Sequence, residues 1–423
     1  MTGVTAPVPE PVARGSEAGR PLHVAQVLDV ELSTRLPDLP AASGGSLAWV
    51  LARRDTEPVA SALVQVPAGG MTGDELRAVL GDPAGTPGFL AGRAEALRAA
   101  PPMCVVVCTR DRPAELRRAL DSLLAQEYPE FRILVVDNAP QTQATAELVR
   151  ELGDERVSYL LAPLPGLSNA RNAAIVAAPG EYLAFTDDDV VADRYWLAEI
   201  ARAFHQHPGA SVVAGAIVPA ELETKPQLWF EQYGGHGKGR GYRQAVFSPA
   251  TAKDQNPLYP LPPFGTGANM VFRPGALEAI GGFDAALGAG MPAAGGEDTL
   301  AFMKVLRQGG VMVYQPSALI RHYHRRDLAG LATQLRGYGT GLTAVYTSLL
   351  LGSPSVLFAL VRLVPTAVRD VFGGGSLRVA GLGEDFPAEL LKGNLRGMLA
   401  GPAAYLRGRR RQRRARRELS RGE

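Results

Sequence analysis

The stretch YLAFTDDDV at residues 182–190 is an apolar run that stops at three consecutive aspartates, Asp187, Asp188 and Asp189. The run is typical of a buried strand, and adjacent carboxylates repel one another unless a cation neutralises them. Hard divalent ions such as Mg²⁺ and Mn²⁺ prefer oxygen ligands, and one or two carboxylates usually hold them together with phosphate. The stretch therefore indicates either a cation site at a strand end or an exposed acidic turn before the next helix.

The sequence around this stretch alternates between short apolar runs and segments with helical spacing. The predicted strands cover residues 103–108, 131–137, 157–161 and 182–187, and the predicted helices cover residues 113–126, 141–152 and 166–178. This alternation predicts an α/β domain with a doubly wound sheet, in which ligands bind at the carboxyl ends of the strands. Thr109, Asp137 and the three aspartates all follow predicted strands, which makes them candidate site residues.

The length of 423 residues predicts more than one domain, and a net charge of +2 argues against a polyanion binder as a whole. Residues 1–20 are polar and rich in Pro and Gly, which predicts a disordered tail without a secretory signal. Residues 21–82 are expected to form a small α/β domain of unknown role, in which Thr72 and Glu75 match a capping box. Residues 83–101 are expected to be a linker.

The two cysteines, Cys104 and Cys108, lie on one predicted strand. Positions i and i+4 of a strand are about 13 Å apart, which is too far for a disulfide. We therefore expect two buried thiols in a reducing compartment.

The C-terminal part is expected to be helical over residues 328–405, either packed on the preceding domain or lying on a bilayer. Residues 337–361 carry no charge, but Gly352 and Pro354 interrupt them, which favours two shorter helices over one membrane span. The tail at residues 406–423 contains eight arginines between Arg407 and Arg417. Since no aromatic residues interleave with them, the run predicts an anchor for anionic lipids rather than a nucleic-acid-binding segment.

Six segments occur in the order found in family 2 glycosyltransferases, which the chain resembles over about residues 102–325. These segments are VVVCTRDRP, ILVVDNA, GLSNARN, YLAFTDDDV, GGFDAALG and GGEDTLAFMKVLRQG. The resemblance implies a catalytic domain at residues 102–327 with the nucleotide-sugar-binding GT-A fold. It also implies inverting chemistry that depends on Mg²⁺ or Mn²⁺.

The resemblance assigns the donor-binding residues. Thr109 and Arg110 correspond to contacts with the nucleoside, and Asp137 to the residue that reads the nucleobase, although an aspartate in a turn is the alternative. Arg171 corresponds to the arginine beside the nucleotide, and a surface arginine is the alternative. Asp187 corresponds to the residue on the ribose.

The resemblance also assigns the metal site. Asp188 is the middle member of the aspartate motif and counts with the donor-binding residues, whereas Asp189 corresponds to the metal ligand that meets the diphosphate. One of His322 and His324 is expected to be a further ligand, with His322 preferred. No cysteine lies nearby and no H-E-x-x-H motif is present, so a zinc site is not expected.

The acceptor side is expected in the second half of the domain. Gly265, Gly267 and Asn269 either let an acceptor approach the backbone or belong to an ordinary turn. By the resemblance, Asp298 is the general base that takes the proton of the acceptor hydroxyl, and Glu297 is the next candidate. The alternative for this pair is a role at the start of a helix, where the dipole favours carboxylates.

Together these features predict an inverting glycosyltransferase of the hexosyltransferase type. It is expected to move a sugar from a UDP-, dTDP- or GDP-linked donor to a glycan or lipid-linked acceptor in cell-envelope glycan synthesis. The expected location is cytoplasmic, peripheral on the inner face of the cell membrane. A nucleotidyltransferase of related fold is one alternative, but CTRDRP lacks the glycines that cradle a triphosphate. A non-catalytic nucleotide-sugar-binding module is the other, and the intact Asp187, Asp189 and Asp298 argue against it.

Overall fold

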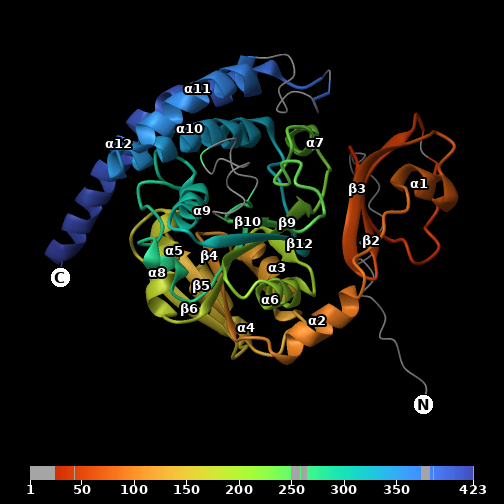
Figure 1. Ribbon diagram of the computed structural model, residues 1–423, viewed down its shortest axis with the longest axis horizontal. Coiled ribbons are helices and arrows are strands. Elements are labelled where there is room, and N and C mark those ends of the chain that lie inside the picture. The colour runs from red at the N-terminus through yellow and green to blue at the C-terminus, as the bar shows by residue number, and fades with distance from the viewer. Residues whose placement is uncertain are drawn as a thin grey trace.

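The computed structural model describes residues 24–41, 43–248, 258, 264–372, 382–383 and 385–422 (Figure 1). The tail predicted at residues 1–20 lies outside the described residues. Within them, a small three-stranded sheet and a central nine-stranded sheet are present, followed by three long helices. In Figure 1 the small sheet and the C-terminal end of the chain lie on opposite sides of the central sheet.

The small sheet consists of β1 (Gln26–Glu31), β2 (Ser46–Arg54) and β3 (Glu57–Val66). Strands β1 and β2 are parallel, and β2 and β3 form an antiparallel hairpin. Helix α1 (Gly73–Leu80) begins with the predicted capping box, in which Thr72 and Glu75 bond to each other's backbone. Apolar side chains from the strands and Leu76 of α1 form a separate core.

Residues 83–101, expected to be a linker, contain helix α2 (Phe89–Arg98). The helix buries Phe89, Arg93 and Ala96 on one side. Arg93 donates a hydrogen bond of 2.6 Å to Glu199 of helix α6 (Trp196–Gln206). The segment is therefore packed against the central unit, with Leu97 and Ala100 against its apolar core and Arg93 paired with Glu199.

The central sheet is mixed. Its order is β10-β12-β9-β11-β7-β4-β5-β6, and β8 pairs with β12. Strands β4 (Met103–Thr109), β5 (Phe131–Asn138), β6 (Val157–Ala162) and β7 (Tyr182–Asp187) are parallel, as the sequence predicts. β11 (Asn269–Phe272) runs antiparallel to β7 and to β9 (Ala210–Pro219). The remaining members are β8 (Val190–Ala192), β10 (Ala245–Phe247) and β12 (Val311–His322). The predicted α/β class is confirmed.

Helices cover both faces of this sheet. Alternate residues of β4 point to different cores: Val105 and Val107 pack with α3 (Pro113–Leu124) and α6, whereas Cys104 and Val106 pack on the other face. That face carries α5 (Leu167–Ala177), α8 (Ala276–Ala279) and α9 (Glu297–Arg307). The remaining helices are α4 (Ala144–Leu152) and α7 (Lys225–Gln232). Both cysteines are free thiols on β4. Cys104 is buried as expected, whereas Cys108 is only partly buried.

The C-terminal helices are α10 (Leu328–Gly352), α11 (Val356–Phe372) and α12 (Ala388–Gly422). Helix α10 ends before Ser353 and Pro354, and α11 begins after them, so two helices form where the sequence predicts two. Val345 and Leu349 of α10 pack with Leu300 and Met303 of α9, which places α10 on the central unit. Among the helices described, none combines the length and the hydrophobicity that a membrane span requires.

Helices α10 and α12 touch through glycines. A Cβ atom on Gly339 would lie 2.0 Å from the backbone oxygen of Asn394, and one on Gly397 would lie 2.2 Å from that of Arg336. The arginine-rich segment, expected to be a separate tail, instead continues α12 to Gly422. It packs on the central unit because Gln412 is buried and accepts a hydrogen bond of 3.1 Å from Asn169 of α5.

Candidate functional site

The parallel strands bring the predicted donor residues to one edge of the sheet. In the register of the sheet, Cys108 lies beside Asp187, and Thr109 lies beside Asp137. Strands β4, β5 and β7 therefore end together, and their last side chains share one edge. This is the edge at which doubly wound sheets bind ligands.

The three aspartates differ in their partners, although Asp188 and Asp189 share Arg112. Asp188 is buried, accepts a hydrogen bond of 2.7 Å from the Thr109 hydroxyl and pairs with Arg112 at 2.6 Å. Asp187 and Asp189 instead approach the Nε2 atom of His322, at 4.0 Å and 3.1 Å. Strand β8 produces this arrangement, because Val190, next in the chain after the triplet, pairs with His322 at the end of β12.

The surroundings shift the pKa values of these carboxyls in different directions. Burial, with the nearby Asp189, raises the pKa of Asp188 to about 7. Burial also raises the pKa of Asp187. For Asp189 burial acts in the same sense, but His322 and Arg112 outweigh it and hold its pKa well below the ordinary range. Asp189 is therefore the member of the triplet whose negative charge is most strongly stabilised.

One ligand atom from each of Asp187, Asp189 and His322 lies within 4.8 Å of the other two. Two oxygens and one imidazole nitrogen form a donor set that suits Mg²⁺ or Mn²⁺. The side chain of Asp187 is 32% exposed, so the group is open on that side. The residues present thus fit a divalent cation. His324 does not belong to this group.

Asp137 is fully buried at the end of β5. Its Oδ2 atom accepts a hydrogen bond of 3.1 Å from the Tyr159 hydroxyl, whereas Oδ1 has no partner among the described residues. Burial raises the pKa of this carboxyl. An unpaired buried acceptor is costly, so Asp137 favours a ligand that donates a hydrogen bond.

Arg171 is only 2% exposed, so the alternative of a surface arginine is wrong. It donates hydrogen bonds to Glu297 at 2.9 Å and to the backbone oxygen of Gly267 at 3.0 Å, and it lies 3.6 Å from Asp187. A Cβ atom on Gly267 would lie 2.8 Å from the guanidinium, so the close approach requires glycine there. Arg171 thereby links α5, the 265–268 turn and the start of α9.

The carboxyl groups of Glu297 and Asp298 lie at the start of α9. The oxygens of Asp298 accept bonds of 2.6 Å from the backbone N–H groups of Gly267 and Thr299. Glu297 has one unpaired oxygen, Oε2, among the described residues. Burial and the adjacent Asp298 raise the pKa of Glu297 to about 7. Asp298 also raises the pKa of Asp187, and Glu297 shares Arg171 with Asp187. Both carboxyls therefore lie in the same group of charges as the aspartate triplet.

Two predicted residues make their contacts within the protein away from the aspartates. Arg110 is exposed and lies 3.7 Å from Asp111, whereas Arg112, two residues later, reaches the aspartates. Asn269, expected near an acceptor, is fully buried. Its side chain forms hydrogen bonds with Ala216, Ala318 and Trp196, and so joins β9, β11 and β12 to α6. The polar atoms of this side chain are therefore paired within the protein.

Sequence reasoning missed Arg112, Glu231 and His236. The Nε2 atom of His324 lies 2.8 Å from Glu231 at the end of α7, and its ring lies beside that of His236. The charge of Arg112 and its place after a strand end were visible signals. Nothing in the sequence links the segment from 231 to 236 with the end of β12.

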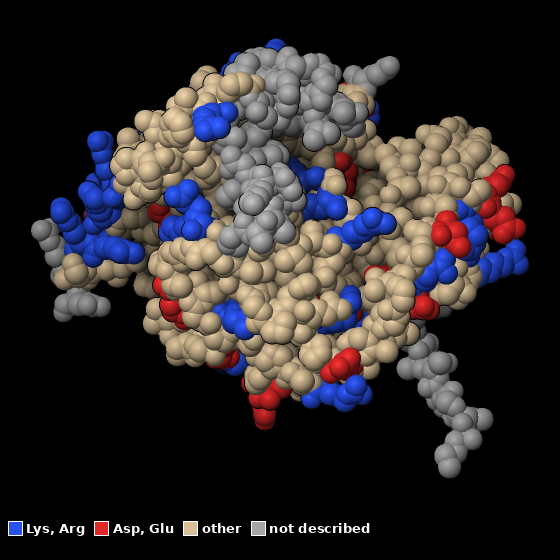
Figure 2. Space-filling model, in the orientation of Figure 1, with Lys and Arg blue, Asp and Glu red and all other residues tan. Residues whose placement is uncertain are grey.

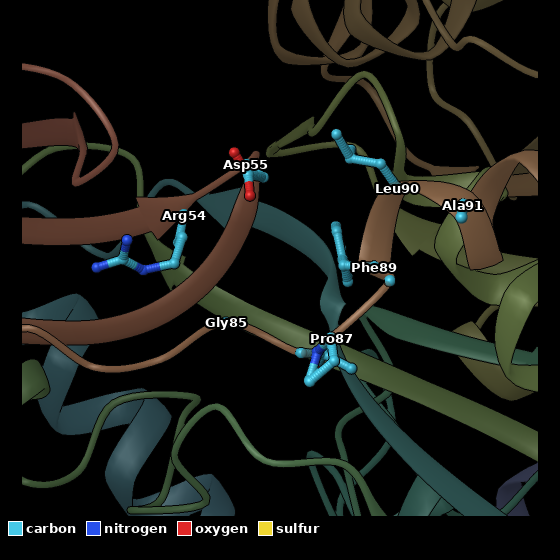
Figure 3. Close-up of a pocket in the computed structure, with 9 residues that line it drawn as sticks. Arg54, Asp55, Gly85, Pro87, Phe89, Leu90 and Ala91 are labelled. Atoms are coloured by element: carbon cyan, nitrogen blue, oxygen red, sulfur yellow. The ribbon is translucent and has the colours of Figure 1, made fainter.

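A cavity of about 320 Å³ lies elsewhere, between the β2–β3 turn and the start of α2 (Figure 3). Arg54, Asp55, Pro87 and Phe89 are among its lining residues. None of the predicted site residues lines it, so it is separate from the strand-end site.

Residues 104–281 match the family model described as glycosyl transferase family 2. The succinoglycan biosynthesis protein ExoM of Rhizobium meliloti is 29% identical over 232 residues, which is 53% of this chain and 68% of that protein. A pre-mycofactocin glycosyltransferase of Mycobacterium tuberculosis is 27% identical over 238 residues, which is 56% of this chain but only 45% of that protein.

A solved structure of the mannosyltransferase PcManGT from Pyrobaculum calidifontis, in complex with GDP-Man and Mn²⁺, is also similar. The comparison covers 77% of this chain and 83% of that one, with 18% identity and a TM-score of 0.42. The matched segment at residues 104–281 contains β4 to β7 and the aspartate triplet. Over this segment the chain is similar to the family 2 glycosyltransferases, and each of the two sequence relatives extends the similarity to more than half of the chain.

Proposed function

We propose that the chain is an inverting, metal-dependent glycosyltransferase that uses a nucleotide-sugar donor, with residues 102–327 as its catalytic domain. The observation that carries the proposal is the grouping of Asp187, Asp189 and His322 at the strand edge that also bears Asp137. Glu297 and Asp298 are joined to this group through Arg171.

We place the donor nucleotide along the ends of β4, β5 and β7. Asp137 would accept a hydrogen bond from a ring N–H of the base through Oδ1, the oxygen that has no protein partner. Thr109 and Asp188 hold Arg112 in place, and this arginine lies close to where a diphosphate would meet Asp189. Asp187, which the family resemblance assigns to the ribose, is the more exposed of the carboxylates and would meet the donor through the cation that it shares with Asp189 and His322.

Asp189, Asp187 and His322 would hold the divalent cation, which supplies positive charge to the diphosphate leaving group. Mn²⁺ and Mg²⁺ both suit these donors.

Asp298 is the proposed general base. In inversion the acceptor hydroxyl attacks the anomeric carbon from the face opposite the leaving diphosphate, and a carboxylate takes its proton. The backbone N–H groups of Gly267 and Thr299 orient the carboxylate of Asp298. Arg171 binds the neighbouring Glu297, so the two carboxyls have different partners: an arginine for Glu297 and backbone N–H groups for Asp298.

The proposed acceptor is a glycan or a lipid-linked glycan of the cell envelope. This rests on the similarity to a succinoglycan biosynthesis protein and on the C-terminal helices. Leu357, Phe358, Val361 and Val364 of α11 are each more than half exposed. The arginines of α12 form a basic surface (Figure 2). Both features favour peripheral contact with an anionic membrane surface.

A thermal-shift screen of UDP-, dTDP- and GDP-linked sugars tests the proposal, with and without Mn²⁺. Ligand at a hundred times its dissociation constant stabilises the folded state by about 2.7 kcal/mol. We expect one nucleotide class to raise the melting temperature only when Mn²⁺ is present, with release of free nucleotide on longer incubation. Stabilisation by nucleoside triphosphates alone, with release of pyrophosphate, would instead indicate a nucleotidyltransferase.

A further inference from the structure

Three histidine rings, those of His236, His322 and His324, lie together beside the carboxylates. Their ring centroids are 4.5 Å, 5.6 Å and 5.7 Å apart, and all three side chains are buried. One nitrogen from each ring lies within 4.8 Å of the other two. His322 and His324 come from the end of β12, whereas His236 comes from the turn after α7. The fold thus joins two segments that are far apart in the sequence.

Carboxylates fix the orientation of two of these rings. The Nε2 atom of His324 lies 2.8 Å from Glu231, and the Nε2 atom of His322 lies 3.1 Å from Asp189. An ionised carboxylate only accepts hydrogen bonds, so Nε2 carries the proton in each pair. In a neutral ring, Nδ1 then presents a lone pair.

Three ring nitrogens in the cluster are buried without a hydrogen-bond partner among the described residues. They are Nε2 of His236, Nδ1 of His322 and Nδ1 of His324. Leaving a buried polar atom unpaired costs about 1–3 kcal/mol, and most such atoms in folded proteins are paired. Three in one cluster therefore point to a ligand that accepts lone pairs.

Aromatic packing alone does not account for this arrangement. Phe230 packs edge-on against His324 and His236, with centroids 4.7 Å and 5.0 Å apart. This contact explains why the rings gather but not why their nitrogens remain unpaired. A histidine that binds a metal through one nitrogen usually donates its other N–H to a carboxylate, as His324 does to Glu231.

We propose that His236, His322 and His324 bind a divalent transition-metal ion of the zinc type. Imidazole nitrogens suit such an ion, whereas the carboxylate oxygens of Asp187 and Asp189 suit Mg²⁺ or Mn²⁺. Nitrogens around tetrahedral zinc lie about 3.3 Å apart, so rings whose nitrogens lie within 4.8 Å of one another would have to close around the ion. His322 stands between the two groups, with Nε2 toward the carboxylates. A neutral ring has a single lone pair, so while Nε2 keeps its proton His322 binds the zinc-type ion through Nδ1 and does not also bind the cation of Asp187 and Asp189.

The turn that carries His236 is built for this approach. Gly234 and Gly235 have φ values of 99° and 51°, and Gly235 donates a backbone hydrogen bond of 2.8 Å to Phe230. A Cβ atom on Gly235 would lie 2.3 Å from the Oε1 atom of Glu231, the oxygen that pairs with His324. Glycine there lets the turn close over the carboxylate–histidine pair.

Metal binding by the full-length chain tests this site. The protein is first stripped with a chelator and then dialysed against Zn²⁺ in the presence of excess Mg²⁺. We expect a single equivalent of Zn²⁺ to bind, and Co²⁺ added in its place to give the visible absorption of a nitrogen-rich site. His236→Ala should abolish both signals. The exposed His205 provides the matched control, since His205→Ala should bind as the wild type does.

Glu231→Gln provides a second test that keeps all three rings and serves if His236→Ala fails to fold. Loss of a carboxylate behind a ligating histidine typically lowers metal affinity about 10- to 100-fold, and we expect that range here. Asp187→Asn should leave Zn²⁺ binding unchanged. The proposal is overturned if the wild type retains no Zn²⁺, if Glu231→Gln binds as tightly as the wild type, or if Asp187→Asn removes the ion.

Discussion

The carboxyls at the strand ends are buried and paired, whereas the arginines on α12 are exposed to solvent. At the strand ends, Asp188 and Asp189 are 5% exposed, and each has fixed partners. On α12 the arginines face solvent, and the side chain of Arg414 is 83% exposed although it pairs with Glu418. A buried charge that loses its partner is left uncompensated, so single changes there have large effects. Exposed charges act additively and are screened by salt.

The largest effect is expected for Asp189→Ala. This change removes a proposed metal ligand and leaves Arg112 and His322 without their shared partner. Loss of several kcal/mol of charge stabilisation corresponds to a decrease in kcat/KM of about 10⁴-fold. Donor binding in Mn²⁺, measured by calorimetry, should be lost together with transfer. The control is Asp121→Ala, which removes an exposed aspartate of α3 that pairs with Arg117. A folded Asp189→Ala variant with unchanged donor affinity would refute the assignment.

The next effect is expected for Asp298→Asn, which distinguishes a reacting carboxylate from a binding one. The amide cannot take a proton, so turnover should fall by about 10²- to 10⁴-fold while the Kd for the donor stays nearly constant. Glu297→Gln is the matched comparison, because the amide oxygen of glutamine can still accept the hydrogen bond from Arg171. If Asp298→Asn retains full turnover and Glu297→Gln does not, Glu297 is the base.

A smaller effect, sensitive to salt, is expected on the arginine surface. Replacing Arg410, Arg413 and Arg417 with Glu should weaken flotation with anionic liposomes, since each basic residue near such a surface contributes about 1 kcal/mol. High salt should have the same effect on the wild type, because exposed charges are screened over about 8 Å at physiological ionic strength.

The matched control for this surface replaces exposed arginines elsewhere, Arg98, Arg117 and Arg150, with Glu. Equal loss of flotation in both triple variants would show that net charge matters rather than α12. If the protein still floats with liposomes after the α12 changes and in high salt, the exposed apolar side chains of α11 make the membrane contact instead.

The smallest effect concerns the small sheet, which docks through a chain of charges. Asp29 accepts hydrogen bonds from Arg53 at 2.9 Å and from Arg321 of β12 at 2.6 Å. Burial opposes ionisation of Asp29, but Arg321 and Arg53 outweigh it and lower its pKa. Its contribution to stability is therefore complete above the ordinary pKa of an aspartate and is lost as the pH falls through the lowered value.

Hydrogen exchange in β1 and β2 measures this contribution. Because the side chain of Asp29 is 40% exposed, Asp29→Asn should lower protection by about 1 kcal/mol or less at neutral pH. The difference between variant and wild type should vanish at acidic pH. Asp74→Asn, at an exposed position of α1, should leave protection unchanged. A difference that persists at acidic pH would mean that Asp29 acts through its shape rather than its charge.

Local patterns predicted most of the fold. The strands from 103 to 187, the Thr72 capping box and the break at Pro354 all follow from composition and spacing within a few residues. Antiparallel β11 and helix α2 did not follow, because strand direction and the Arg93–Glu199 pair depend on distant contacts. The path of α12 could not be predicted for the same reason, since buried Gln412 lies within an arginine-rich run.

The site was predictable to the extent that strand ends determine it. Asp137 and the aspartate triplet follow predicted strands, so the sheet order brings them together. Arg112 was missed in favour of Arg110, because the turn after β4 decides which arginine faces the carboxylates. His236 and Glu231 could not be found, since only the tertiary fold brings the end of α7 to the end of β12.

The crossing of α10 and α12 has a consequence for tracing the ancestry of this chain. Gly397 and Gly401 are one helical turn apart, and a Cβ atom on Gly401 would lie 1.9 Å from the Thr343 hydroxyl oxygen. Even alanine would push the two backbones apart, so any descendant that keeps this crossing must keep glycine at these positions. These positions and Gly339 therefore form a signature by which other chains with the same C-terminal pair of helices can be recognised when the rest of their sequence has diverged.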